Sequence, residues 1–366
     1  MRILIVTRSF FPENSPRAYR ATELCKEFTR QGHEVVVFTL KKPKTHNDFE
    51  REYNVKIKDL GSLKFRSPYF GNSRIGFFLT RAVFRFLSLS IEYPDIELVY
   101  KVKKALKGIK CYDLLVSIAV PYPIHWGVAW ARTSKNRIAK IWVADCGDPY
   151  MGCETDSFRK LFYFKYVEKW FMRKADYISI PVESARKGYY DEFHGKIRVI
   201  PQGFRIEPIT GAGSMVENNV PTFAYAGGFI PNIRDPRPFL EYLSTLENEF
   251  KFIVYTNTPS LLTSYQGMLN GRLEIREYIP RKELLQILCK MDFLVNFDNN
   301  TGVQVPSKLI DYALTGRPVL NIKAKIESER IVEFLNGDYS GQFNLEDIQN
   351  YNIENVVKKF LCCFNQ

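Results

Sequence analysis

The stretch VPSKLIDYALTGRPVL, at residues 305–320, indicates the fold class and predicts a ligand site. It follows an apolar run, residues 293–297, of the kind that forms a buried strand. A helix is expected from Pro306, because proline suits the first helical turn, where its missing N–H costs nothing. Ser307 and Lys308 then lie at the helix N-terminus, where free N–H groups and the helix dipole favour an anion. Lys308 adds a full positive charge, so the segment predicts a phosphate site.

The same helix carries a hydroxyl acceptor one turn further on. Asp311 is close enough to the helix start to accept hydrogen bonds from a sugar hydroxyl. Gly316 is expected to end the helix, and Pro318 opens the next apolar run, residues 319–322. A phosphate site beside a hydroxyl acceptor suits a nucleotide diphosphate-sugar. An ordinary connection from a buried strand to a helix is the alternative.

Short apolar runs alternate with helical stretches along the chain, which predicts parallel α/β sheets. In the first half, strands are expected at residues 3–7, 34–39, 113–118, 138–144, 177–181 and 198–201. In the second half, they are expected at residues 222–226, 252–256, 273–278, 293–297 and 318–322. Helices are expected at residues 17–31 and, with an amphipathic pattern, at residues 353–364. Residues 205–220 contain proline, glycine and an Asn-Asn pair without an apolar period, so they form the best linker candidate.

The opening segment resembles the donor-site signature of retaining GT-B glycosyltransferases of family 4. In that signature a loop and a helix N-terminus hold the diphosphate, which implies donor contacts for Ser307 and Lys308. Asp311 has the position of the second glutamate in the family's E-x7-E motif, which binds the ribose. The position of the first glutamate, near the transferred sugar, is Val303 in this chain. Gln304 or backbone N–H groups of the loop are the candidates to replace that sugar contact.

The resemblance implies two Rossmann-like domains that face each other across a cleft, which is the GT-B arrangement. Residues 1–204 are expected to form the acceptor-binding domain, and residues 205–350 the nucleotide-sugar-binding domain. Residues 351–366 are expected to form the helix that crosses back to the first domain in this family. A chain of 366 residues is long enough for two domains with substantial cores.

Two more segments of the second domain resemble the family's donor site. FAYAGGF resembles the strand that opens the diphosphate site, with Gly228 at the position of the usual arginine. Arg234 has the position of a family lysine, and it either binds the diphosphate or decorates an exposed loop beside Asp235. Backbone groups near Tyr278 and Ile279 have the position that reads the base edge. The Tyr278 ring either stacks on the base or packs in the core.

Polar residues follow several predicted strands at the edge where open α/β sheets bind ligands. Those of the second domain are candidates for sugar contacts: Asn296, Asp298 and Asn299. In the first domain, Asp148 resembles the acidic position of an rDpW-type segment in a subset of the family, which implies that it holds or deprotonates the acceptor hydroxyl. His125 either contributes to catalysis or caps a helix and packs against Trp126.

The loop after the first strand, SFFPENSPR, resembles a pPe…s…R pattern of the same subset. This resemblance implies that Ser15 and Arg20 reach the donor. Arg17 is expected to be solvated instead.

The net charge of +12 is unevenly distributed along the chain. Residues 1–205 carry a balance of +16 and residues 206–366 a balance of −4. Such asymmetry implies an anionic partner for the first half. No RNA-binding aromatic motif, zinc finger or recognisable helix-turn-helix accompanies the basic residues, so nucleic acid is not the expected partner. An anionic membrane surface is the favoured interpretation.

A helix expected from about residue 75 combines exposed aromatic residues with spaced arginines, which suits the surface of an anionic lipid layer. The residues expected to contact the membrane are Arg74, Phe77, Phe78, Arg81 and Arg85. A second basic and aromatic run, residues 159–174, is expected to join them. The alternative is that both are core-facing helices with solvated backs. Since no apolar stretch reaches membrane-spanning length, the expected location is cytoplasmic and peripheral on the inner face of the membrane.

These features together predict a metal-independent retaining hexosyltransferase. Its donor is expected to be a nucleotide-sugar, a UDP-sugar rather than a GDP-sugar, and its acceptor a lipid-linked or membrane-proximal glycan in surface polysaccharide assembly. No metal or cofactor is expected, because there is no D-x-D in a suitable loop and no His/Cys cluster. The seven cysteines lack metal spacing and indicate reduced thiols. The alternative is a non-catalytic, nucleotide-binding homologue that acts as a scaffold in a glycan assembly complex.

Overall fold

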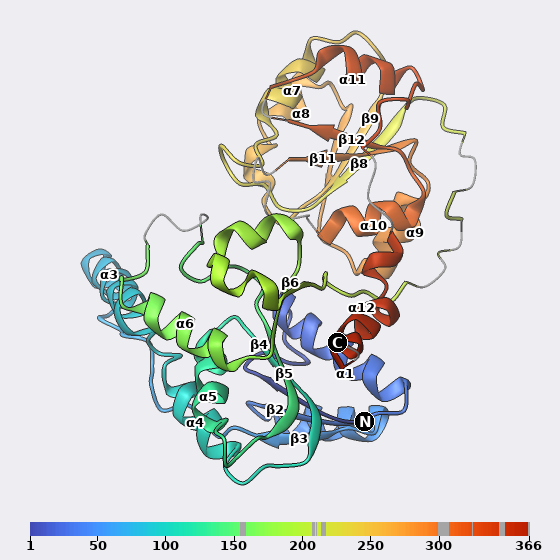
Figure 1. Ribbon diagram of the computed structural model, residues 1–366. Helices are drawn as coiled ribbons and strands as arrows, with labels where there is room; N and C mark the ends of the chain where they lie inside the picture. Colours follow the sequence, from blue (N-terminus) through green and yellow to red (C-terminus); the bar gives the residue numbers. More distant parts are fainter. Residues whose placement is uncertain are drawn as a thin grey trace. The chain divides into compact units, whose positions relative to one another are not determined.

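The structure is a computed structural model that describes residues 1–153, 159–206, 209, 211–213, 217–298, 307–323, 325–343 and 348–364. The chain divides into two compact units (Figure 1). The first unit comprises Met1–Arg205 and Tyr351–Gln366, and the second unit comprises Ile206–Asn350. Each unit is an α/β domain with its own parallel sheet, as the alternating pattern predicts.

Seven described strands form the parallel sheet of the first unit, in the order β3-β2-β1-β4-β5-β6-β7. The strands are β1 (Arg2–Thr7), β2 (Glu34–Thr39), β3 (Lys56–Asp59), β4 (Tyr112–Ile118), β5 (Ala139–Asp145), β6 (Tyr177–Ile180) and β7 (Ile197–Val199). The central strands β1 and β4 are buried along most of their length, because helices cover both faces of the sheet. The carboxyl ends of β1, β4 and β5 therefore lie side by side at one edge.

Helices on both faces bury the first sheet. They are α1 (Pro16–Arg30), α2 (Pro43–Tyr53), α3 (Arg74–Ile91), α4 (Glu97–Ala105), α5 (Pro123–Ala131) and α6 (Phe164–Lys174), with 3-10 turns at Glu183–Gly188 and Asp191–Lys196. Leu24 and Phe28 of α1 and Phe49 of α2 share one core with β1, β2 and β4. On the other face α4 packs against α5, and α5 against α6 (Figure 1).

The helix at the end of the chain belongs to the first unit, as predicted. α12 (Ile353–Leu361) begins after Asn352, whose side chain accepts a hydrogen bond from the N–H of Glu354. Its apolar face packs on α1, and Val357 and Phe360 are fully buried in the core shared with that helix. The 3-10 turn Cys362–Phe364 follows. The returning segment is therefore part of the first core rather than a tail.

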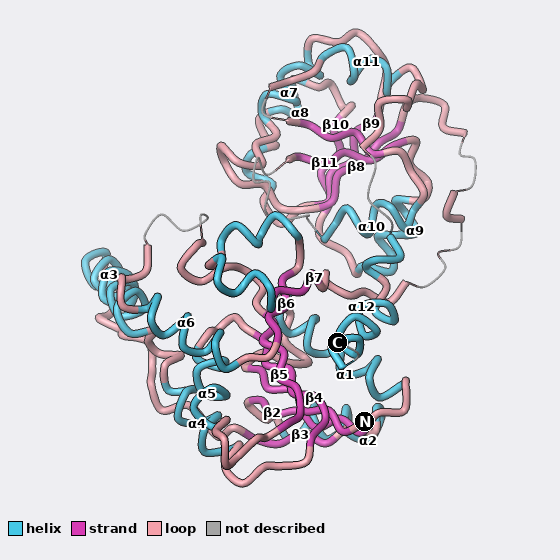
Figure 2. Tube along the Cα trace, viewed as in Figure 1, coloured by secondary structure: helices cyan, strands magenta, loops and turns pink. Residues whose placement is uncertain are grey.

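The second unit contains a five-stranded parallel sheet in the order β10-β9-β8-β11-β12 (Figure 2). Its strands are β8 (Thr222–Ala226), β9 (Lys251–Tyr255), β10 (Leu273–Arg276), β11 (Phe293–Phe297) and β12 (Val319–Ile322). Its helices are α7 (Arg237–Ser244), α8 (Tyr265–Met268), α9 (Arg281–Leu288), α10 (Ser307–Thr315) and α11 (Ser328–Leu335), with 3-10 turns at Pro259–Leu261 and Ile348–Tyr351. One core lies under α7, α8 and α11, and a second lies under α9 and α10.

Candidate functional site

The candidate site of the second unit lies at the carboxyl end of β8. The chain passes from β8 to β9 on one side and returns to β11 on the other, so the strand order reverses beside β8. Open α/β sheets bind ligands outside such a point. After β8 the backbone turns at Gly227, whose φ of 153° favours glycine. This turn brings the carbonyl of Gly228 to the hydroxyl of Tyr225, which donates to it at 2.9 Å.

Lys308, in the first turn of α10, reaches the same hydroxyl. Its Nζ donates to Tyr225 Oη at 3.3 Å and lies 4.3 Å from the centre of the Tyr225 ring. Burial, together with the nearby charge of Arg234, lowers the pKa of Lys308 from 10.5 to about 7. Among the described residues, Lys308 forms no ion pair with a carboxylate that would reverse this shift. The site therefore contains a half-buried amine whose charged form an anion would stabilise.

Arg234 supplies a second cation at the same hydroxyl. Burial raises the pKa of Tyr225 to about 12, while the charge of Arg234 and its hydrogen bond to the hydroxyl act in the opposite direction. The backbone hydrogen bonds between Ile230 and Arg234 close a short loop that returns Arg234 towards β8. Asp235 pairs with Arg237, at 2.8 Å from Nε, and not with Arg234. Arg234 is thus not part of an exposed pair with Asp235, and its Nε has no hydrogen-bond partner within the described part of the chain.

Asp311 lies on α10 and is held by an arginine that the sequence analysis did not single out. Arg281, at the start of α9, donates from Nε and Nη2 to Oδ1 of Asp311 at 2.9 and 2.6 Å. Among the described residues Oδ2 accepts no hydrogen bond, so it is available to a hydroxyl group. Burial raises the pKa of Asp311, and the charge of Arg281 opposes that rise. The carboxylate is therefore oriented by Arg281 while one oxygen remains open.

Several predicted donor residues lie around this centre or outside the described residues. Asn299, Val303 and Gln304 lie outside the described residues, as does the side chain of Ser307. Gly228 lies in the turn after β8, near Asn257 and Thr258. The Tyr278 ring is 69% exposed, so the prediction that it packs in the core is wrong. Ile279 packs partly against the core under α9 and α10.

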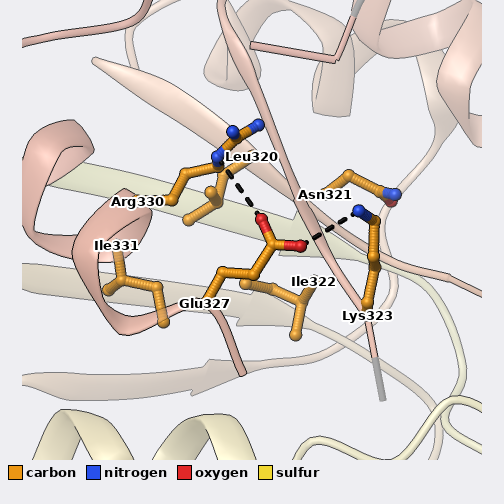
Figure 3. Close-up of a pocket in the computed structure, with 7 residues that line it drawn as sticks. All are labelled: Leu320, Asn321, Ile322, Lys323, Glu327, Arg330 and Ile331. Carbon is orange, nitrogen blue, oxygen red and sulfur yellow. Dashed lines mark hydrogen bonds and ion pairs between the residues drawn. The ribbon is translucent and has the colours of Figure 1, made fainter. Parts of the chain in front are cut away.

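The carboxyl ends of β11 and β12 are joined by side-chain amides. Nδ2 of Asn296 donates to Oδ1 of Asn321 at 2.5 Å, and Asn321 in turn lies 3.5 Å from a carboxylate oxygen of Asp298. Figure 3 shows a hollow beyond β12, where Glu327 binds Lys323 at 3.0 Å. The hollow is lined by Leu320, Asn321, Ile322, Lys323, Glu327, Arg330 and Ile331. Its volume of about 10 Å³ holds about one water molecule, so it is not a sugar site.

In the first unit, the prediction that His125 is catalytic is wrong. Its ring is fully buried in α5, with Nδ1 2.8 Å from Oγ of Ser117 and Nε2 3.5 Å from Sγ of Cys146. The ring also stacks on Phe171, with ring centres 5.2 Å apart. Burial lowers the pKa of His125 to about 3, so the ring is neutral and takes part in packing. Both ring nitrogens face buried protein groups, so the ring presents neither nitrogen to a substrate.

Arg20 is also a core residue, against the prediction that it reaches the donor. Only 3% of Arg20 is exposed, and its guanidinium binds both carboxylate oxygens of Asp145, at 3.1 and 2.9 Å. It also donates to the carbonyls of Ile200 and Pro201. Burial alone would raise the pKa of Asp145, but the charge and hydrogen bonds of Arg20 lower it below its ordinary value. The pair ties α1 to the carboxyl ends of β5 and β7.

Ser15 and Asp148 lie in loops at the carboxyl edge of the first sheet. Oγ of Ser15 caps α1 by accepting from the N–H of Ala18 at 3.2 Å. Asp148 is half-buried in the loop after β5, where its carbonyl accepts a hydrogen bond from the Tyr122 hydroxyl. The predicted roles of both side chains remain predictions.

The predicted membrane-contact helix, α3, lies at the periphery of the first unit (Figure 1). Its buried residues comprise Gly76 alone, whereas Phe77 and Phe78 are 60% and 69% exposed. Arg74 and Arg81 are exposed as well, and the Arg81 guanidinium lies 5.7 Å from the centre of the Phe77 ring. The alternative of a core-facing helix is therefore wrong for α3, whereas it is correct for α6, which buries Phe164, Phe171 and Met172. Among the described residues, no helix is both long and apolar enough to cross a membrane.

Two residues at these positions, Tyr225 and Arg281, were not predicted from the sequence, and a third, Arg17, was expected to be solvated but is half-buried. Tyr225 has the apolar neighbours of a core strand residue, and its hydroxyl becomes significant only once Lys308 is placed beside it. Arg281 is 30 residues from Asp311, so no local pattern connects them. Arg17 lies against Gly147, and the glycine between Asp145 and Asp148 was the available signal.

Comparison with known proteins shows the family and the fold. A family model described as Glycosyltransferase Family 4 matches residues 18–207, and the chain belongs to that family. The fold also matches solved GT-B glycosyltransferases over the whole chain. The lipopolysaccharide outer core galactosyltransferase WaaB, in its apo form, is 13% identical with a TM-score of 0.60, and the match covers 100% of this chain and 99% of that one.

Two further structures have the same fold. TarM is 10% identical with a TM-score of 0.64, and the match covers 100% of this chain and 99% of TarM. Anabaena HepE in complex with UDP is 11% identical with a TM-score of 0.60, and the match covers both chains completely. At these identities the likeness shows the GT-B fold alone. No protein of curated function matches the sequence.

Proposed function

We propose that this transferase moves a sugar from a nucleotide diphosphate donor, with retention, to a lipid-linked or membrane-proximal glycan. The observation that carries the proposal is the meeting of Lys308 and Arg234 at the Tyr225 hydroxyl, where burial and mutual repulsion lower the pKa of Lys308 to about 7. A diphosphate supplies the negative charge that this arrangement favours. As the bond to the sugar breaks, charge grows on the leaving diphosphate, and the two cations stabilise it.

The nucleoside end of the donor is assigned to Asp311 and Tyr278. The open oxygen of Asp311 accepts a ribose hydroxyl, and the exposed Tyr278 ring offers a stacking face for the base. A UDP-sugar is favoured over a GDP-sugar. Support comes from HepE, whose structures contain UDP and UDP-glucose, and from S. aureus TarM, whose complex contains UDP. Retention rests on the resemblance to the family's donor signature.

The acceptor is assigned to the first unit, in surface polysaccharide assembly on the inner face of the membrane. Asp148, in the loop after β5, is the proposed group that holds or deprotonates the acceptor hydroxyl. The stretch from residue 60 to residue 91 contains five lysines and arginines and no aspartate or glutamate. With the exposed aromatic residues of α3, this charge suits an anionic lipid surface.

A second surface segment is attached to α3. Lys160 forms an ion pair with Glu92, and the Tyr163 hydroxyl donates to the carbonyl of Ser90. Phe162, between them in sequence, is 73% exposed. We therefore include residues 160–163, directly before α6, in the proposed membrane surface, beside the carboxyl end of α3.

A panel of UDP- and GDP-sugars tests the donor assignment. The purified chain should be stabilised against thermal unfolding by UDP-sugars and less by GDP-sugars, because ligands that bind only the folded state raise the melting temperature. We expect this stabilisation and sugar transfer to persist in EDTA, since side-chain cations are assigned to the diphosphate. A chain that gains no stability with either nucleotide class contradicts the proposal.

The non-catalytic alternative is favoured by departures from the family signature at Val303, where the family has a glutamate near the transferred sugar, at Gly228 and at Ser15-Pro16. It predicts nucleotide binding without turnover. Slow hydrolysis of the UDP-sugar to UDP and free sugar, measured at a saturating donor concentration, separates the two. Hydrolysis above the uncatalysed rate supports the enzyme, and tight binding with no hydrolysis and no transfer supports the scaffold.

A further inference from the structure

Arg17 is placed where the carboxyl ends of three strands meet. It lies in the first turn of α1, directly after the loop that follows β1. Its guanidinium lies against Gly147, in the loop that follows β5, so closely that a Cβ atom on Gly147 would overlap it. β1 and β5 are both neighbours of β4, whose own loop begins at Ala119. Glycine at position 147 therefore provides the space that Arg17 occupies.

The positive charge of Arg17 is only partly compensated by Asp145: burial raises the pKa of that carboxylate, and the charge of Arg20 and then that of Arg17 lower it. Asp145 is buried, and both of its oxygens are bound by Arg20. The Ser179 hydroxyl donates to the same carboxylate at 2.5 Å. Within the described part of the chain, Arg17 has neither a hydrogen bond nor an ion pair. The arginine is half-buried and therefore remains accessible to a ligand.

We propose that Arg17 binds a phosphate group of the acceptor, so that the acceptor is a phosphate-bearing glycan carrier. This inference rests on the proposed function, because it assigns the acceptor of that transfer. A guanidinium presents a planar pair of donors that matches two phosphate oxygens. Its position beside the Asp148 loop puts the phosphate near the group assigned to the acceptor hydroxyl. The phosphate belongs either to a lipid diphosphate or to a phosphorylated sugar.

Two probes distinguish these sources. Farnesyl diphosphate represents a lipid diphosphate and glucose 1-phosphate a phosphorylated sugar. Each is titrated by calorimetry into the full chain with UDP at saturation, so that the donor site is already filled. We expect one of them to bind, and Arg17→Gln to raise its Kd roughly 10- to 100-fold, as for loss of a charged hydrogen bond. The Kd of UDP itself should not change.

Two further variants test the geometry. Gly147→Ala keeps the charge of Arg17 but displaces its guanidinium, and should weaken the same probe to a similar degree. Arg17→Lys keeps the charge without the planar fork, and should lose less affinity than Arg17→Gln. Arg51→Gln, at an exposed arginine of α2, is the matched control and should change nothing. A fall in the melting temperature of Gly147→Ala would indicate a folding defect. The probe affinity of Arg17→Gln then tests the role of Arg17 instead.

The results that overturn this inference differ from those that overturn the proposed function. A chain that binds UDP but neither phosphate probe contradicts the role of Arg17 alone. Equal probe affinity in the wild type and Arg17→Gln contradicts it as well. A rise in the Kd of UDP in Arg17→Gln would place Arg17 in the donor site instead. A wild-type chain that binds no UDP contradicts the proposed function.

Discussion

At the scale of single residues, Lys308 gives the site a pH dependence with a definite sign. In the free protein burial and Arg234 lower the pKa of Lys308 to about 7, so the ammonium is about half protonated at neutral pH. A bound diphosphate favours the ammonium and raises that pKa, so binding takes up a proton. UDP affinity should therefore fall as pH rises above 7, by at most about tenfold per pH unit.

Calorimetric titrations of UDP between pH 6.5 and 9 measure this slope. The range stays above the second phosphate pKa of about 6, so the charge of the ligand changes little. Lys308→Met is the control variant and should give a flatter curve with weaker binding at pH 7. The account is contradicted if the variant keeps the full slope of the wild type.

Arg281 and Asp311 should act as one unit in donor binding. Asp311→Asn should raise the Michaelis constant for the donor, because a carboxylate accepts ribose hydroxyls better than an amide does. Arg281→Gln removes the cation that opposes the raised pKa of Asp311. Donor affinity, which needs the ionised carboxylate, should then be lost at a higher pH on acidification than in the wild type.

A double-mutant comparison checks this coupling. If Arg281 and Asp311 act together, the double variant should lose less donor-binding free energy than the sum of the losses in the two single variants. Melting temperatures of all three variants provide the control for a structural role. Normal kinetics with a lower melting temperature would make Asp311 a structural residue.

Asp148→Asn should lower turnover without weakening nucleotide binding. A group that holds or accepts a proton in the transition state contributes about 10²-fold or more to the rate. The expected result is a kcat reduced by about 10²-fold with an unchanged Kd for UDP. Equal losses in turnover and UDP binding would remove Asp148 from the acceptor role.

At the scale of elements, most strands and the main helices were predictable from the sequence. β2, β8 and β11 have the predicted bounds, because each is a continuous apolar run in a sheet covered on both faces. β3 was missed because it reads Lys-Ile-Lys-Asp, an edge strand with one buried residue. The pattern of apolar residues identifies strands that are buried on both faces. It does not identify an edge strand such as β3, which has one buried residue.

The site was only partly predictable, for a different reason. Lys308 and Asp311 follow from local helix chemistry, but their partners Tyr225 and Arg281 lie 83 and 30 residues away. Arg20 and His125 were misassigned because a charged or titratable residue near a strand end has the same sequence pattern whether it faces a ligand or the core. The bond between Arg20 and Asp145 spans 125 residues, and only the fold brings the two together.

Helix α3 should bind anionic membranes by charge and by aromatic contact. Each basic residue near such a surface contributes about 1 kcal/mol, so Arg74→Gln with Arg81→Gln should weaken partitioning roughly 30-fold. Sedimentation with anionic and neutral vesicles at two salt concentrations measures it. High salt should weaken wild-type binding, since exposed charges are screened beyond about 8–10 Å at physiological ionic strength.

Two controls accompany this measurement. Lys44, Arg51 and Lys56, all exposed on α2 and β3, can be changed to glutamine together, and this should leave binding unchanged. Phe77→Ser with Phe78→Ser should reduce the part of the binding that survives high salt. Equal, negligible sedimentation with both vesicle types would contradict membrane binding by α3. The acceptor would then be a soluble molecule.

At the scale of the whole molecule, each unit has its own core, and the two units are assigned different tasks. The first carries the excess positive charge, the exposed α3 helix and the loops assigned to the acceptor. The second carries the two cations assigned to the diphosphate and the carboxylate assigned to the ribose. The chain returns to the first core through α12, so the first unit is formed by two segments and the second unit by one continuous segment.

The central claim is that Arg234 and Lys308 bind the donor diphosphate, and UDP titration of one double variant tests it most directly. Arg234→Gln with Lys308→Met removes both charges with little change in side-chain size, and relieves a buried repulsion, so the fold should be kept. The account predicts that the variant melts no lower than the wild type and binds UDP at least about 100-fold more weakly. A variant that binds UDP as tightly as the wild type would contradict it.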